Sequence, residues 1–193
     1  MKALIIYAHP WDGSFNHSVL EAVRKGLSDS GHKIDLIDLV KDDFNPVMSE
    51  KELALYSKGG SLDPKVIDYQ ARIGEADYLF FIFPNWWGGV PAILKGFFDK
   101  VFLKNFAYKK EPAPGNGLLD IKGAAVISTF DAPSIVYHMM FKPHMKKNIA
   151  FQLLRTNGVR SVKLFPFFRV QDIGDRKRKS FLAKIESFAK SLK

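Results

Sequence analysis

Residues 78–83 read Tyr-Leu-Phe-Phe-Ile-Phe, an apolar run with no polar alternation. Such a run is typical of a strand that is buried on both faces in the middle of a parallel sheet. Residues 3–8 (Ala-Leu-Ile-Ile-Tyr-Ala) have the same character, and residues 33–39 alternate between polar and apolar positions. With two further short segments, residues 124–128 (Ala-Ala-Val-Ile-Ser) and 162–165 (Val-Lys-Leu-Phe), the sequence predicts five strands.

Residue patterns that are typical of helices lie between these predicted strands. Apolar side chains at helical spacing predict helices after the first and third strands and at the end of the chain. Capping signals predict where helices begin: a capping box at residues 49–52, Asp63 before Pro64, and Pro91. The order β-α-β-α-β-α-β-α-β predicts one α/β domain over residues 1–193, with a parallel sheet and right-handed crossovers.

The composition narrows the class of protein. The chain has 193 residues, of which 47% are hydrophobic and 25% are charged, as in globular domains. It has no cysteine, which excludes a disulfide framework, thiolate metal sites and a cysteine nucleophile. No apolar run approaches the ~20 residues of a membrane span, and we expect a cytoplasmic protein. An excess of 29 Lys and Arg over 20 Asp and Glu suggests anionic partners such as phosphates, or only a well-dispersed protein.

Ligands of open parallel sheets bind beyond the carboxyl ends of the strands, so the loops after the first, third and fourth strands matter most. The first loop holds His9, Ser14 and Asn16 and leads into a helix. Helix N-terminal amides together with hydroxyl and amide groups predict an anion site. The alternative is a plain helix cap by Ser14 or Asn16. Neither a G-x-G-x-x-G dinucleotide motif nor a Walker loop occurs in the chain.

The second loop, Pro84-Asn-Trp-Trp-Gly-Gly89, carries two adjacent tryptophans at this edge of the sheet. Aromatic rings in a loop flanked by glycines are suited to packing against a flat aromatic ligand. Glycine also lets the backbone approach a ligand closely. The alternative is that Trp86 or Trp87 covers the core or a contact between two subunits.

The third loop offers polar groups and proton donors. Thr129 and Asp131 are candidates for hydrogen bonds to a polar ring edge, and Tyr137, His138 and His144 are candidate proton donors, unless the histidines are ordinary surface residues. The sequence lacks a nucleophile elbow and a clustered metal-ligand motif, so hydrolase and metalloenzyme hypotheses are weak.

These loops resemble the flavodoxin-like NAD(P)H:quinone oxidoreductases, a family that includes the bacterial modulator-of-drug-activity proteins, the ancillary quinone reductases of potassium efflux systems and the mammalian quinone reductases. The resemblance runs roughly from Leu4 to Val170, and its Gly89–Gly96 block is highly specific. The matching segments are Ala8-His9-Pro10, Ser14-Phe15-Asn16, Phe44-Asn45-Pro46, Phe83 to Trp87, Gly89-Val-Pro-Ala-Ile-Leu-Lys-Gly96 continuing to Val101-Phe102, and Phe106-Ala107-Tyr108.

The resemblance implies a doubly wound five-stranded parallel sheet in the order 2-1-3-4-5, with helices on both faces. It implies a tightly held flavin, usually FAD and in some members FMN, and NAD(P)H as co-substrate. It also implies a homodimer with the site at the interface. In the implied ping-pong reaction, NAD(P)H reduces the flavin and leaves, and a quinone then takes two electrons in the same pocket.

The resemblance also implies roles for individual residues. The flavin phosphates and ribityl chain would be held by His9, Ser14, Phe15 and Asn16; the ring by Pro84, Asn85, Trp86, Trp87 and Gly88; and its polar end by Thr129, Phe130, Asp131 and Ala132. Tyr137 matches a tyrosine that stabilises charge on the reduced flavin, and Tyr108 matches a wall of the quinone pocket, which Trp87 would also line. In the family a histidine six residues after the tyrosine that Tyr137 matches relays protons; that position is Pro143 here, and His144 lies one position further along the chain. The turn Thr-Phe-Asp-Ala-Pro at residues 129–133 resembles that of the bacterial members.

Three alternatives remain beside this enzyme. One is a one-electron carrier of the flavodoxin type, which the positive charge disfavours because such carriers are typically acidic. Another is a flavin-binding regulatory subunit of a membrane transporter, which the basic run Arg176–Lys179 would suit, although the apolar stripe of that helix fits packing on the sheet. Nucleic-acid binding is disfavoured because the basic residues are scattered. The long stretch from Lys104 to Lys122 predicts a lid, a binding loop or a mobile segment.

Overall fold

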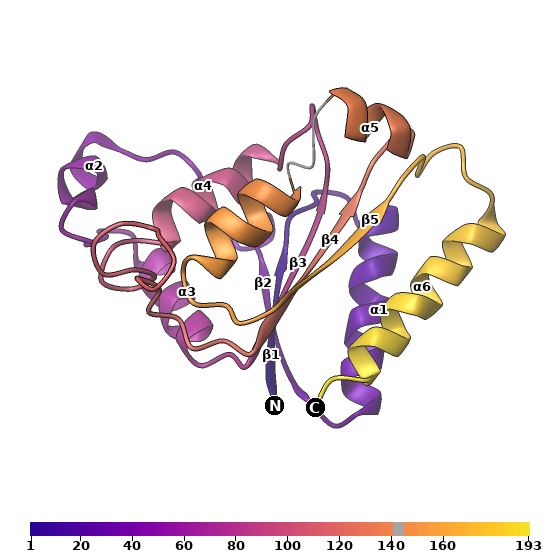
Figure 1. Cartoon of the computed structure of the whole chain (residues 1–193), viewed down its shortest axis with the longest axis horizontal. Coiled ribbons are helices and arrows are strands. Elements are labelled where there is room, and N and C mark those ends of the chain that lie inside the picture. Colours follow the sequence, from indigo (N-terminus) through magenta and orange to yellow (C-terminus); the bar gives the residue numbers. More distant parts are fainter. Residues whose placement is uncertain (141–144) are drawn as a thin grey trace.

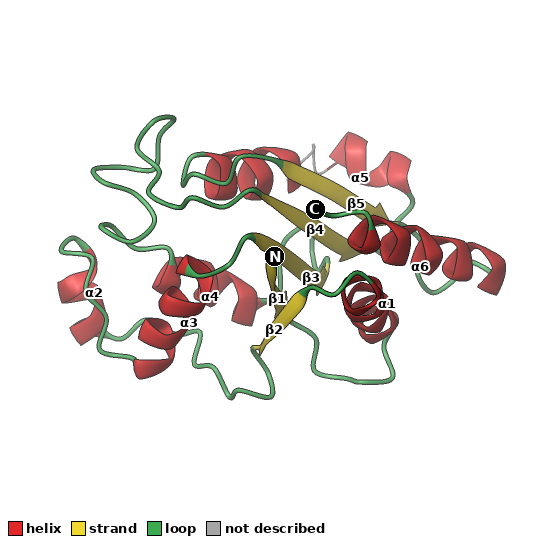
Figure 2. Cartoon of the chain, turned by 90° about the horizontal axis from the view of Figure 1, so that it is seen from below, coloured by secondary structure: helices red, strands yellow, loops and turns green. Residues whose placement is uncertain are grey.

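Five parallel strands form one sheet in the order β2-β1-β3-β4-β5 (Figure 2). The computed structural model describes residues 1–140 and 145–193, with Met140 by its backbone alone. Every neighbouring pair of strands is parallel. The strands are β1 (Lys2–Tyr7), β2 (Lys33–Asp38), β3 (Tyr78–Pro84), β4 (Gly123–Thr129) and β5 (Val162–Phe167). The predicted fold class and strand order are therefore confirmed.

The apolar run at residues 78–83 lies at the centre of the sheet, as its composition predicts. All residues of β3 and β4 are buried. Phe80 lies in register with Ile5 of β1 on one side and with Ala125 of β4 on the other. The edge strand β2, whose sequence alternates, is partly exposed.

Helices cover both faces of the sheet (Figure 1). Helices α1 (Phe15–Asp29) and α6 (Asp175–Lys190) pack side by side on one face, over one hydrophobic cluster that includes Ile5 and Phe80. Helices α3 (Pro64–Gly74), α4 (Ala92–Val101) and η1 (Met145–Arg155) cover the other face. This layering leaves the carboxyl edge of the sheet, where β1, β3 and β4 end, for the loops.

The capping signals begin their helices where the sequence predicts. Ser49 and Glu52 form a reciprocal capping box at α2 (Glu50–Tyr56), and Asp63 caps α3 with Pro64 at its first position. Pro91 is the N-cap residue of α4 rather than its first helical residue. The difference is one position, because proline's fixed φ also suits the residue just before a helix.

The segment between β4 and β5 is less regular than the alternation of strands and helices predicts. It contains α5 (Ser134–Met140) and then η1, an 11-residue π-helix. The stretch from Lys104 to Lys122 has no helix and pairs only through isolated bridges, among them Tyr108 with Gly117. Within residues 1–140 and 145–193, every helix is too short or too polar to span a lipid bilayer.

Candidate functional site

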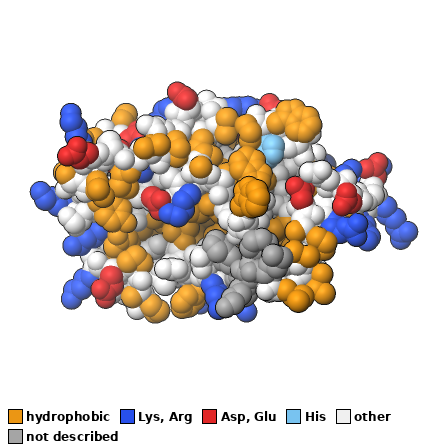
Figure 3. All heavy atoms as spheres, turned by 90° about the horizontal axis from the view of Figure 1, so that it is seen from above, with side chains coloured by type: hydrophobic (Ala, Val, Ile, Leu, Met, Phe, Trp, Pro, Cys, Tyr) orange, Lys and Arg blue, Asp and Glu red, His pale blue; other side chains and the backbone are white. Residues whose placement is uncertain are grey.

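Two adjoining pockets open at the carboxyl edge of the sheet. The first has a volume of about 540 Å³ and the second about 310 Å³. They share Asn85, Trp86 and Asp131. Figure 3 looks onto this edge and shows hydrophobic side chains gathered over its centre, with most Lys and Arg side chains around its margins.

All thirteen residues that the sequence nominates for cofactor binding line one of these two pockets. The first pocket holds His9, Ser14, Phe15, Asn16, Pro84, Asn85, Trp86, Thr129 and Asp131. The second adds Trp87, Gly88, Phe130 and Ala132. Three loops that are far apart in the sequence therefore meet as one continuous lining.

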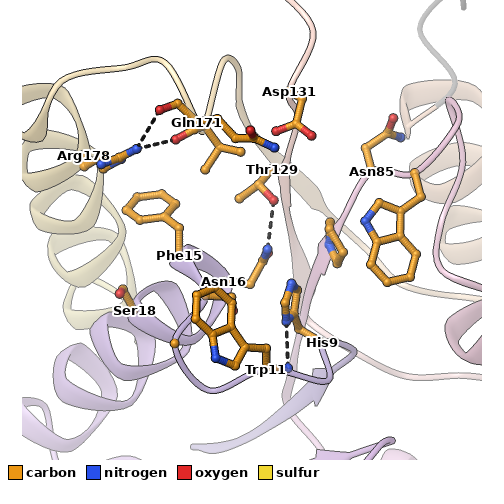
Figure 4. Close-up of a pocket in the computed structure, with 15 residues that line it drawn as sticks. His9, Trp11, Phe15, Asn16, Ser18, Asn85, Thr129, Asp131, Gln171 and Arg178 are labelled. Atoms are coloured by element: carbon orange, nitrogen blue, oxygen red, sulfur yellow. Dashed lines mark hydrogen bonds between the residues drawn. The ribbon is translucent and has the colours of Figure 1, made fainter.

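Asn16 joins the first loop to the third. It is 4% exposed, and its Nδ2 donates a hydrogen bond to Oγ1 of Thr129 at 2.9 Å (Figure 4). Ser14 caps α1, because its Oγ accepts a hydrogen bond from the backbone N–H of His17 at 3.2 Å. The capping alternative is thus correct for Ser14, which also lines the pocket. The partial positive charge of the α1 N-terminus therefore lies at this pocket.

His9 presents a hydrogen-bond donor at the same pocket. Its Nδ1 accepts a hydrogen bond from the backbone N–H of Trp11 at 3.1 Å, which favours the neutral tautomer with the proton on Nε2. Burial lowers the pKa of His9 below its usual value, because the charged form loses solvation. At neutral pH the side chain is therefore an uncharged N–H donor.

The tryptophan loop forms a tight turn. The backbone of Trp86 and Gly89 exchanges two hydrogen bonds, of 3.1 and 2.9 Å. Both central residues have positive φ, 52° at Trp87 and 78° at Gly88, as a type I′ turn requires. Asn85 braces the turn, since its Nδ2 donates to the carbonyl of Gly89. The Trp87 side chain is fully exposed, with a relative accessibility of 101%.

The end of the first pocket opposite Asn85 is built by residues that the sequence did not nominate (Figure 4). Arg178 of α6 lines it together with Val170 and Gln171, whose carbonyl oxygens accept hydrogen bonds from its Nη2 at 2.7 and 3.2 Å. Its Nε is buried and has no acceptor among the described residues. The only sequence signal was the basic run at residues 176–179. The other lining residues not nominated are Trp11, Gly13 and Ser18.

Tyr137 lies beneath the third loop, outside the lining of either pocket. It is buried, and its ring packs against Phe130 with centroids 4.8 Å apart. Its hydroxyl oxygen accepts a hydrogen bond from the backbone N–H of Met145 at 3.1 Å, so its own O–H is available to donate. His144 lies outside the described residues, and Nδ1 of His138 lies 2.7 Å from the carbonyl oxygen of Ser134.

Tyr108 lies in a different pocket. This pocket has a volume of about 320 Å³ and lies between α4 and η1, and Tyr56 also lines it. Burial, together with the nearby Tyr56 hydroxyl, raises the pKa of Tyr108. Within one chain, the structure therefore does not bring Tyr108 to the lining of the tryptophan turn.

The two adjoining pockets fit a ligand that carries both an anionic group and a flat ring. N–H groups at the α1 N-terminus, the His9 donor and Arg178 suit a phosphate. The tryptophan turn suits a ring, and Thr129 and Asp131 lie between the two regions. A flavin nucleotide has this combination of parts.

Comparisons with known proteins agree with the fold. A family model described as "Flavodoxin-like fold" matches residues 1–192. NAD(P)H dehydrogenase [quinone] 1 of Cavia porcellus is 34% identical over 154 residues, which cover 72% of this chain and 56% of that protein. An uncharacterized NAD(P)H oxidoreductase of Haemophilus influenzae is 35% identical over 123 residues, which cover 63% of this chain and 60% of that protein. The chain thus spans less than two thirds of the length of these relatives.

Two solved structures match nearly the whole chain. An NAD(P)H:quinone oxidoreductase from Methanothermobacter marburgensis is 29% identical with a TM-score of 0.87, covering 98% of this chain and 96% of that one. Smu.1420 from Streptococcus mutans UA159 is 34% identical with a TM-score of 0.85 and full coverage of both chains. The chain belongs to the flavodoxin-like fold family and, within it, is similar to the NAD(P)H:quinone oxidoreductases.

Proposed function

We propose that the protein is an NAD(P)H-dependent flavoprotein that passes two electrons to quinones or related acceptors in a ping-pong reaction. The observation that carries this proposal is the convergence of three loops into one lining, with anion donors at one end and the tryptophan turn at the other. The similarity to named quinone oxidoreductases supports it.

The cofactor proposed for the two adjoining pockets is FAD, with FMN as the alternative. A flavin bound there would supply the transfer of a hydride from NAD(P)H to the acceptor. The first pocket extends past Ser18 to Val170 and Arg178, which offers a cation and space beyond one phosphate at the α1 N-terminus. This extension favours a dinucleotide over a mononucleotide.

The chain's own residues would bind the flavin and orient its ring. His9 donates through Nε2, Asn16 fixes the first loop to Thr129, and the tryptophan turn packs against the ring. A donor near the polar edge of the ring stabilises negative charge that develops there during hydride transfer. We propose Tyr137 as this donor: it lies directly behind Phe130, a residue of the second pocket, and its oxygen accepts a hydrogen bond from the Met145 N–H.

We propose that the protein is a homodimer and that residues of both subunits form each site. Tyr108 and the tryptophan turn line separate pockets of one chain. They therefore contact the same acceptor only if a second copy brings its Tyr108 to the site. We propose a cytoplasmic location, because the proposed reductant NAD(P)H is present there.

The decisive experiment is a visible spectrum of the purified protein before and after anaerobic NADPH. We expect absorbance near ~450 nm that bleaches with NADPH and returns with a quinone. Heat release and chromatography of the same sample distinguish FAD from FMN. A protein that takes up no added flavin would refute the enzyme and favour a binding module that keeps the fold without the flavin chemistry.

A further inference from the structure

Helix α2 is attached to the molecule in an unusual way. None of its residues is buried, and both views show it at one end of the molecule, away from the sheet (Figures 1 and 2). Amphipathic helices are normally held by an apolar face, which α2 does not bury. Its position must therefore depend on a few polar contacts and on the turns that flank it.

The main polar contact is with a buried lysine. Lys100 of α4 is 3% exposed, and each of its three N–H groups can be assigned an acceptor. Nζ lies 3.0 Å from the carbonyl oxygen of Asn45, 3.0 Å from Oδ2 of Asp63 and 3.0 Å from Oε1 of Glu52. Glu52 is the partner that α2 supplies. Because Lys100 is buried, its attraction to Glu52 is little screened by water and salt, so this ion pair ties α2 to α4.

The same helix contributes a wall to the pocket that holds Tyr108. Tyr56, the last residue of α2, lines that pocket together with a set of aromatic and amide side chains. These include Phe98, Phe102 and Tyr108, with Gln152 on the η1 side. With them the lining has aliphatic side chains and the Lys95–Asp99 ion pair. Such a mixed lining suits a ring that carries polar substituents.

We propose that α2 is the size-limiting wall of this pocket, and that the Glu52–Lys100 ion pair fixes Tyr56 where it restricts the number of fused rings an acceptor can have. The proposal rests on the proposed function, in which Tyr108 contacts the quinone. Glu52 is a positioning residue, because it acts through α2, and Tyr56 is the residue that meets the ligand.

Glu52→Gln tests the ion pair with little change of shape. In the protein, Oε2 of Glu52 accepts hydrogen bonds from the backbone N–H and the hydroxyl of Ser49, while Oε1 faces Lys100. Glutamine has one acceptor oxygen, so it keeps the helix cap or the lysine contact but not both. The matched control is Glu50→Gln, an exposed position in the same helical turn with the same change of charge.

The measurement is kcat/KM of the flavin-loaded protein for a one-ring quinone, 1,4-benzoquinone, and a three-ring quinone, 9,10-phenanthrenequinone. We expect Glu52→Gln and Tyr56→Ala to raise the three-ring to one-ring ratio roughly fivefold, through a lower KM for the larger quinone. Glu50→Gln should keep the wild-type ratio, and the rate of flavin reduction by NADPH should not change. Faster hydrogen exchange of the α2 amides in Glu52→Gln would report the loosened helix directly.

An unchanged ratio in both Glu52→Gln and Tyr56→Ala would overturn the proposal, and Tyr56→Ala alone decides if the Glu52 variant does not fold. Failure of the proposed function gives a different result, since the wild-type protein would then reduce neither quinone. In that case equilibrium dialysis without NAD(P)H gives the ratio of the affinities for the two quinones. An unchanged affinity ratio in Tyr56→Ala would overturn the proposal that α2 limits the size of the pocket.

Discussion

At the scale of single residues, Trp87 combines a strained backbone with a fully exposed ring. Its φ of 52° is rare for a bulky side chain, and it lies at a turn position where asparagine is preferred. We expect Trp87→Asn to raise the free energy of unfolding by about 1 kcal/mol, because asparagine tolerates this conformation. We expect the same change to lower kcat/KM for the quinone roughly two- to tenfold, because the ring is lost.

Urea unfolding and steady-state kinetics measure the two effects of Trp87→Asn. Trp87→Phe is the control, since it keeps a ring and the backbone strain and should change neither quantity much. An Asn variant with wild-type turnover would remove Trp87 from the site. An Asn variant without added stability would show that the turn carries no strain.

The residues of the site divide according to how they could be found from the sequence. His9, Asn16 and the tryptophan loop follow predicted strands directly, so their convergence followed from the topology of a parallel sheet. Arg178 follows no strand and reaches the pocket because α6 packs beside α1. That contact depends on tertiary packing over more than 150 positions, which no local pattern encodes.

At the scale of elements, two helical glycines differ in what surrounds them. A Cβ at Gly96 of α4 would lie 2.3 Å from the carbonyl oxygen of Pro46 and 2.5 Å from its Cα, so this backbone would have to shift. Gly74, the last residue of α3, has nothing within 4 Å. We expect Gly96→Ala to destabilise the protein by about 1–3 kcal/mol, because it overpacks a close contact. We expect Gly74→Ala to stabilise it by about 0.5 kcal/mol.

Urea unfolding of these two alanine variants, at equal protein concentration, gives the comparison. Pro46 follows Asn45, whose carbonyl accepts a hydrogen bond from Lys100, and Lys100 also pairs with Glu52 of α2. A shift of Pro46 in the Gly96 variant should therefore disturb Lys100 and loosen α2. Equal stability of both variants would show that the segment around Pro46 moves freely to accept the methyl group.

The strands and most helices were predictable from the sequence because their signals are local. A strand that is buried on both faces has apolar residues at every position, and capping residues mark where α2 and α3 begin. The π-helix η1 was not predictable, since its hydrogen-bond pattern differs from that of an α-helix while its residue types do not. The type I′ turn at Trp87 was likewise hidden, because the sequence there lacks the usual Asn-Gly pair.

At the scale of the whole molecule, the separation of Tyr108 from the tryptophan turn is the feature that a second subunit must explain. One chain places them in different pockets. If each site takes its cofactor loops from one protomer and Tyr108 from the other, defects in the two parts complement each other. A mixed dimer of Asn16→Ala and Tyr108→Ala chains then has one site with both defects and one site with neither.

We therefore expect the protein to sediment as a dimer, and we expect two weakly active variants to regain activity when mixed. After unfolding and refolding together in equal amounts, half of the dimers are mixed and half of their sites are intact, so activity should reach roughly a quarter of wild type. The control is the same mixture without unfolding, in which stable dimers do not exchange chains. If Tyr108 instead serves the site of its own chain, every site in the mixture carries a defect and no activity returns, which would contradict the shared site while leaving the flavin pocket in place.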